Sequence, residues 1–116
     1  MKYFTLDEFD CPSLPNSGKN MDTNFLTKLE EAREIAGVPF KITSGYRTKE
    51  HNEAVGGVAN SSHLIGVAAD IAVSSGSKRY IILNALLKAG FKRIGVAKTF
   101  IHCDTDPNKP NSVWTY

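Results

Sequence analysis

The segment Val67-Ala68-Ala69-Asp70-Ile71-Ala72-Val73 decides the fold, because it places one acid inside an otherwise apolar run. Its length and its apolar, β-branched content predict a buried strand. Side chains alternate between the two faces of a strand, so Asp70 shares a face with two small alanines while Ile71 faces the core. A buried carboxylate is rarely left alone, so Asp70 either pairs with an arginine, caps a loop or binds a metal.

Helical and strand patterns alternate on both sides of this segment, which predicts an α+β fold with a small central antiparallel sheet and helices packed on it. The last two strands are separated only by a turn, so we expect them to pair antiparallel. Gly37 and Gly90 follow the two longer helices, as expected for C-terminal caps. The predicted elements are helices over 23–36, 48–55 and 77–88, strands over 38–43, 67–73, 94–97 and 99–104, and a loop over 106–111.

Composition restricts the class of protein. The 116 residues predict one compact domain, 1–116, and 41% hydrophobic with 22% charged residues argue against disorder. A net charge of +2 without a basic block gives no support for nucleic-acid binding. No stretch is apolar enough for a membrane span or a signal peptide, so we expect synthesis in the cytoplasm. We also expect a monomer. Cys11 and Cys103 are too few for a disulfide scaffold and are predicted to be reduced thiols.

Two histidines complete a candidate metal site around Asp70. His63 lies seven residues before Asp70, and His102 lies in Phe100-Ile101-His102-Cys103-Asp104, where alternation places His102 and Asp104 on one face. Two histidines and one aspartate form a zinc ligand set that leaves a fourth position for water, as catalytic zinc sites do. Such a metal suits peptide hydrolysis. The chain has no His-Glu-x-x-His helix, so spacing alone is a weak signal.

Several motifs resemble one family of zinc peptidases. The string Ser61-x-His63-x-x-Gly66-x-Ala68-x-Asp70 resembles the first metal motif of the zinc D-Ala-D-Ala carboxypeptidases, whose relatives include phage peptidoglycan endopeptidases and the Hedgehog signalling domain. Phe100 to Asp104 is similar to the second metal motif of the compact branch of that family. Ile42-Thr43-Ser44-Gly45-Tyr46-Arg47 resembles the strand leading to the family's active-site arginine, and Phe4-x-Leu6-x-Glu8-Phe9 also resembles this branch. The resemblance covers nearly the whole chain.

The resemblance implies a Hedgehog-like zinc peptidase fold with one Zn²⁺ per chain, held by His63, Asp70 and His102. It implies that Arg47 binds the substrate carboxylate or the developing oxyanion, both of which suit a planar guanidinium. The alternative for Arg47 is a surface pair with Glu50 or Glu53. Ser61 is implied to hydrogen-bond near the metal or the substrate, and its alternative is a turn serine.

The general base is where the sequence departs from the family pattern. Several relatives carry Glu or Asp three residues before the last histidine ligand, and this chain carries Thr99. Asp104 is the predicted substitute as general base, or else it orients His102. Trp114 is a candidate wall of the cleft or a packing residue. His51 and Asn52, which follow Arg47, are candidates to line the cleft without a catalytic role.

The leading prediction is therefore a zinc metallopeptidase that acts on peptidoglycan stem peptides. Either a D-Ala-D-Ala carboxypeptidase or an L-Ala-D-Glu-type endopeptidase fits, in the setting of a phage lysin or a virion component that reaches the cell wall. The alternative is a non-catalytic zinc-containing binding module of the same fold, which Thr99 keeps open. A metal-free structural domain explains Asp70 poorly. The bond that is cut and the host stay open.

Overall fold

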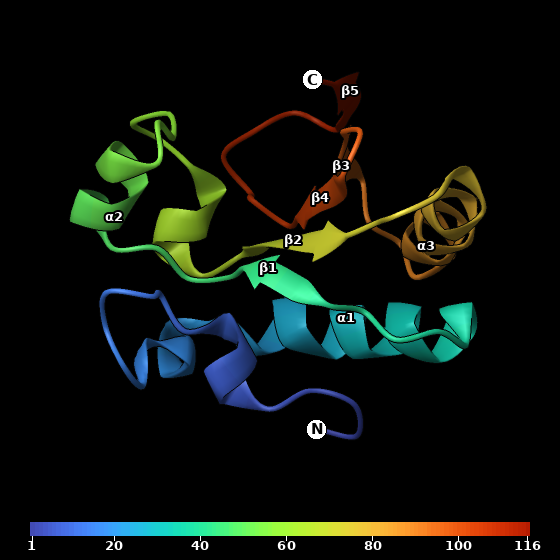
Figure 1. The fold of residues 1–116 in the computed structure, drawn as a ribbon, viewed down its shortest axis with the longest axis horizontal. Helices are drawn as coiled ribbons and strands as arrows, with labels where there is room; N and C mark the ends of the chain where they lie inside the picture. The colour runs from blue at the N-terminus through green and yellow to red at the C-terminus, as the bar shows by residue number, and fades with distance from the viewer.

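A computed structural model describes residues 1–116 and confirms the α+β fold (Figure 1). The three predicted helices are present, and three short 3-10 helices (η1 to η3) lie in stretches for which no helix was predicted. The elements in chain order are η1 Leu6–Phe9, η2 Ser17–Asn20, α1 Thr23–Ala36, β1 Ile42–Ser44, α2 Lys49–Ala54, η3 Ser62–Ile65, β2 Ala68–Ala72, α3 Gly76–Lys88, β3 Arg93–Val96, β4 Phe100–Asp104 and β5 Ser112–Thr115. None of the helices has the length and apolar character needed to cross a membrane.

The five strands form one sheet in the order β1-β2-β4-β3-β5. The pairs β1–β2, β2–β4 and β4–β3 are antiparallel, as expected, but β5 runs parallel to β3, so the sheet is mixed. The sequence prediction missed β5, which is four residues long and lies at the edge of the sheet, after a loop rich in Pro and Asn. The first strand is shorter than the predicted 38–43, because Pro39 has no N–H to donate to a ladder and Phe40 is buried outside the sheet.

The core lies between helices α1 and α3 and one face of the sheet (Figure 1). Asp22 caps α1 by accepting a hydrogen bond from the backbone N–H of Phe25 at 2.9 Å. Ala69 and Ile71 of β2, together with Ile101 of β4, belong to this core, as the alternation predicted. The opposite face of β2 and β4 therefore presents Asp70 and His102 away from the core.

Gly66 joins η3 to β2 at a crowded point. Its φ is +74°, and a Cβ built on it would lie 2.2 Å from the carbonyl oxygen of Asn20. We expect Gly66→Ala to lower the free energy of unfolding by about 1–2 kcal/mol for the left-handed backbone, and by about 1–3 kcal/mol more for the overlap. Urea denaturation of the metal-free protein measures this loss.

Gly37 supplies a matched control, because its φ is +68° and a Cβ there meets no atom within 4 Å. Gly37→Ala should show only the backbone cost, about 1–2 kcal/mol. An equal loss in both variants would show that the contact with Asn20 is unimportant.

Candidate metal centre

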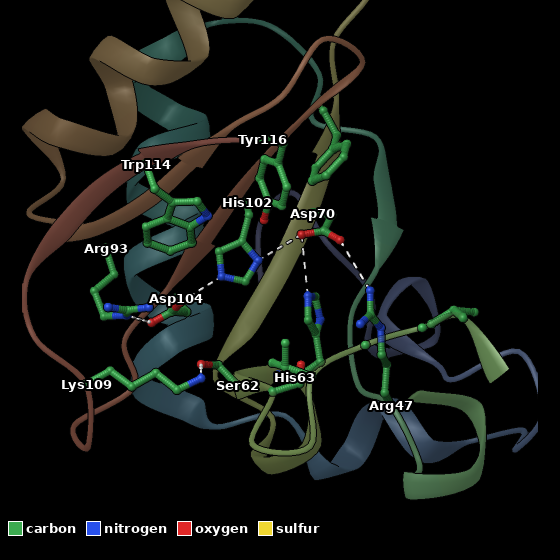
Figure 2. A pocket seen from close by; sticks show the side chains of 16 residues that line it. Arg47, Ser62, His63, Asp70, Arg93, His102, Asp104, Lys109, Trp114 and Tyr116 are labelled. Atoms are coloured by element: carbon green, nitrogen blue, oxygen red, sulfur yellow. Dashed lines mark hydrogen bonds and ion pairs between the residues drawn. The ribbon is translucent and has the colours of Figure 1, made fainter. Parts of the chain in front are cut away.

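Three side chains that are far apart in sequence meet on the solvent-side face of the sheet (Figure 2). His63 lies on η3, Asp70 on β2 and His102 on β4, and all three are buried. The sheet register pairs Asp70 directly with His102. One potential ligand atom from each residue lies within 4.8 Å of the other two. The structure thus brings together the three residues that the sequence singled out.

The backbone around Gly45 sets the orientation of His63. The ring atom Nδ1 of His63 lies 2.7 Å from the carbonyl oxygen of Gly45. A carbonyl can only accept, so Nδ1 carries a proton, and Nε2 lies 3.4 Å from Oδ1 of Asp70. A side chain at position 45 would collide with Phe9, since a Cβ there lies 2.7 Å from the Phe9 Cα. Gly45 therefore lets the carbonyl come close enough to fix the histidine.

Asp104 sets the orientation of His102 in the same way. His102 Nε2 lies 2.7 Å from Oδ2 of Asp104, and His102 Nδ1 lies 3.0 Å from Oδ1 of Asp70. Burial alone would raise the pKa of Asp104, but hydrogen bonds from His102, from the Asp106 amide and from Arg93 lower it. Asp104 is therefore an anion that accepts a hydrogen bond from the Nε2–H of His102, and His102 presents Nδ1 toward Asp70.

The donor set fits a zinc ion. Burial alone would raise the pKa of Asp70, but His102 and His63 beside it hold that pKa well below its usual range. Two imidazole nitrogens and a carboxylate oxygen thus face one small volume, where a single cation could bind all three. Two nitrogens and one oxygen are ligands that Zn²⁺ accepts. Histidine ligands of metals also typically donate their second N–H to a carbonyl or a carboxylate, as His63 and His102 do here.

Arg47 is directed toward this cluster and makes no ion pair with Glu50 or Glu53 (Figure 2). Its Nη2 lies 3.6 Å from Oδ2 of Asp70, and its side chain is 16% exposed. Nε donates to Ser44 Oγ at 3.0 Å, and Nη1 donates to Asn52 Oδ1 at 3.2 Å. These bonds hold a guanidinium at the edge of the candidate metal site.

A cavity of about 400 Å³ opens over the cluster. Arg47 and Ser61 line it, and Ser61 also caps η3 by accepting a hydrogen bond from the His63 N–H at 3.3 Å. Trp114 lines it as well, with its ring centroid 5.4 Å from that of His102, so it both walls the cavity and packs on the site. Neither His51 nor Asn52 lines the cavity. Asn52 instead accepts a hydrogen bond from Arg47, which does line it.

The geometry of Asp104 favours the orienting role over the role of general base. Its carboxylate is bound by His102, Arg93 and the Asp106 amide, and its side chain has 0% exposure. It also lies on the ring nitrogen of His102 that points away from Asp70. An acid in this position cannot reach a reacting molecule in front of the metal ligands without breaking these bonds.

Sequence reasoning missed residues that hydrogen-bond to the neighbours of the candidate ligands. Arg93 of β3 lies opposite Asp104 in the sheet register and donates to it at 2.7 Å. Lys109 reaches back to the carbonyl of Asn60 at 2.7 Å. The available signal was the alternation of β3, but its register against β4 had to be known before Arg93 could be matched with Asp104.

Comparison with known proteins identifies the family. A search of the curated proteins found no match. The family model described as peptidase M15 matches residues 2–104, which is most of the chain and includes all three candidate ligands. Peptidases of this family are zinc-dependent, in agreement with the donor set described above. The chain therefore belongs to the peptidase M15 family.

Proposed function

We propose that this chain is a zinc metallopeptidase that hydrolyses peptide bonds in bacterial peptidoglycan stem peptides. The observation that carries the proposal is the convergence of His63 Nε2, His102 Nδ1 and an Asp70 oxygen at a cavity that Arg47 also lines. Residues 1–116 would form one catalytic domain that works as a monomer with one Zn²⁺. The setting of a phage lysin or virion component belongs to the same proposal and rests on the resemblance to phage peptidoglycan endopeptidases.

The residues around the cavity would have different roles in the reaction. Zinc held by these three ligands supplies Lewis acidity for attack on a peptide carbonyl. Arg47, fixed by Ser44 and Asn52, offers N–H donors to a substrate carboxylate or to charge that develops on the carbonyl oxygen. His63 and His102 keep their orientation because each donates its second N–H to Gly45 or Asp104.

The character of the cavity supports a peptide that carries a carboxylate near the bond to be cut. Arg47 brings a positive charge to one side, and Phe100, Trp114 and Tyr116 bring aromatic rings to the cavity wall. A planar guanidinium binds a carboxylate through two parallel hydrogen bonds. A D-Ala-D-Ala terminus and an L-Ala-D-Glu link both place a carboxylate close to the scissile bond.

One observation favours the alternative, a non-catalytic zinc-containing binding module. The only carboxylates that line the cavity are Asp70 and Asp104, and both are engaged. Thr99, at the position where relatives carry an acid, does not line the cavity. A binding module would need no proton acceptor, whereas a peptidase must recruit one.

Digestion of purified peptidoglycan with and without a chelator tests the proposal. We expect a carboxypeptidase to release free D-Ala and an endopeptidase to release stem-peptide fragments, as identified by mass spectrometry. The chelator should stop release, and added Zn²⁺ should restore it. Tight binding to peptidoglycan without any released product would instead establish the binding module.

A further inference from the structure

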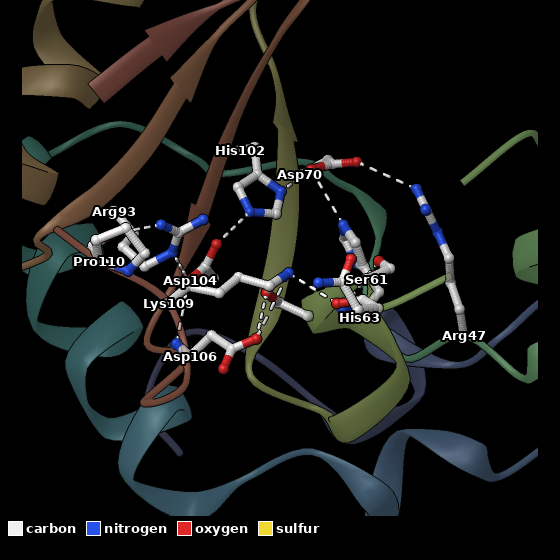
Figure 3. Close-up of polar contacts among 12 residues, drawn as sticks. Arg47, Ser61, His63, Asp70, Arg93, His102, Asp104, Asp106, Lys109 and Pro110 are labelled. Atoms are coloured by element: carbon white, nitrogen blue, oxygen red, sulfur yellow. Dashed lines mark hydrogen bonds and ion pairs between the residues drawn. The ribbon is translucent and has the colours of Figure 1, made fainter. Parts of the chain in front are cut away.

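The twelve residues after β4 lie beyond the stretch matched by the family, yet they contact the site repeatedly (Figure 3). We propose that this C-terminal segment, residues 105–116, positions both histidine ligands for the metal, with Arg93 and Lys109 as the positioning residues that connect it to them. The inference rests on the proposed zinc site and extends it to residues that no motif marks.

The first branch runs from the segment to His102. Arg93 Nε donates to Asp104 Oδ1 at 2.7 Å, and Arg93 Nη1 donates to the carbonyl oxygen of Pro110 at 2.5 Å. The Asp106 amide donates to the same Asp104 oxygen at 3.0 Å. Since Asp104 Oδ2 accepts from His102, the segment fixes the carboxylate that fixes the imidazole.

Trp114 of β5 closes this branch. Its ring lies 4.8 Å from the Arg93 guanidinium carbon and 5.4 Å from the centroid of the His102 ring. Arg93 is thus held by a carboxylate, a carbonyl and an aromatic face, while its side chain is 13% exposed. A partly desolvated cation–π contact strengthens such an arrangement.

The second branch runs from the segment to the stretch that carries His63. Ser62 Oγ donates to Asp106 Oδ2 at 2.7 Å, and Lys109 Nζ donates to Ser62 Oγ at 3.1 Å. Lys109 Nζ also donates to the Asn60 carbonyl at 2.7 Å and lies 3.6 Å from Asp106 Oδ2. These bonds fasten residues 60 to 62, immediately before His63, to the loop after β4.

The two branches have a common physical consequence. Asp104 is buried, so losing Arg93 leaves a buried anion without its arginine partner and frees it to turn away from His102. Losing the Lys109 ammonium removes the two hydrogen bonds that it donates to the stretch before His63. Either change should make the metal-binding geometry less populated and therefore weaken zinc binding.

The test compares Arg93→Met and Lys109→Met in the full chain, with Lys92→Met as the matched control. Lys92 is exposed, and Lys92→Met removes the same charge one position before Arg93. Chelator competition should show zinc affinity weaker by about tenfold to a hundredfold in Arg93→Met and by about tenfold in Lys109→Met. Lys92→Met should bind zinc as the unmodified chain does.

A second readout separates positioning from general destabilisation. In the zinc-loaded protein, NMR should show the His102 Nε2 proton exchanging slowly with water, and this protection should be lost in Arg93→Met but kept in Lys109→Met. The zinc affinity of Arg93→Lys should fall between that of the unmodified chain and that of Arg93→Met, because one ammonium cannot bond both Asp104 and the Pro110 carbonyl as a fixed guanidinium does. This variant also keeps the test open if Arg93→Met does not fold.

The outcomes distinguish this inference from the proposed function. Unchanged zinc affinity in both Arg93 variants, or an equal loss in Lys92→Met, would overturn the positioning role while leaving the peptidase proposal standing. Weaker zinc binding with unprotected His102 would support it even if no peptidoglycan fragment were ever released. A chain that binds no zinc at all would overturn both.

Discussion

Asp70→Ala is expected to abolish stoichiometric zinc binding. Asp70 supplies the only carboxylate of the three-residue donor set, and its Oδ1 faces both His63 and His102. Without it, only two imidazoles remain, and a site with two ligands does not hold zinc tightly at neutral pH. Metal analysis after dialysis should give one zinc per unmodified chain and a small fraction of that for the variant.

Thermal unfolding supplies a second measurement of the same change. Zinc that binds only the folded chain should raise the melting temperature of the unmodified protein, and this increase should vanish in Asp70→Ala. Glu31→Ala is the control, because Glu31 is an exposed acid of α1 and its loss should leave both results unchanged. One zinc per chain in the Asp70→Ala protein would remove Asp70 from the site.

The candidate metal site could be anticipated because its signals are local. Asp70 is conspicuous in an apolar strand, and alternation alone put His102 on the face opposite Ile101 and Cys103. Both strands have the predicted faces in the structure. The resemblance implied that His63, Asp70 and His102 hold one metal, but it did not predict that β2 pairs with β4, since nothing in either strand states which strand it pairs with.

The supporting residues could not be anticipated because their signals are non-local. Asp104 could be read as a base or as an orienting group until the register placed Arg93 against it. β5 is a short edge strand whose pairing with β3 depends on the course of the preceding loop. A sequence pattern records which residues can face a site, whereas the partners that saturate them depend on how distant strands align.

Arg47→Ala is expected to lower the rate of peptide hydrolysis on the order of a hundredfold or more while zinc stays bound. Its Nη2 lies 3.6 Å from Asp70 Oδ2, beside the ligand set but outside it, so its loss removes charge stabilisation without removing a ligand. The rate of fragment release from peptidoglycan, measured at saturating zinc, gives the effect. Lys49→Ala, which removes an exposed charge at the start of α2, is the control.

Two further variants test why an arginine is needed at this position. Arg47→Lys should recover only part of the activity, because an ammonium cannot donate to a substrate carboxylate in the bidentate geometry of a guanidinium. Asn52→Ala should give a smaller loss than Arg47→Ala, because it frees Nη1 but leaves the Ser44 contact that also orients the side chain. Near-normal turnover in Arg47→Ala would mean that Arg47 only neutralises Asp70. The donor that stabilises developing charge would then have to be another residue lining the cavity, such as Tyr116, whose hydroxyl can donate a hydrogen bond.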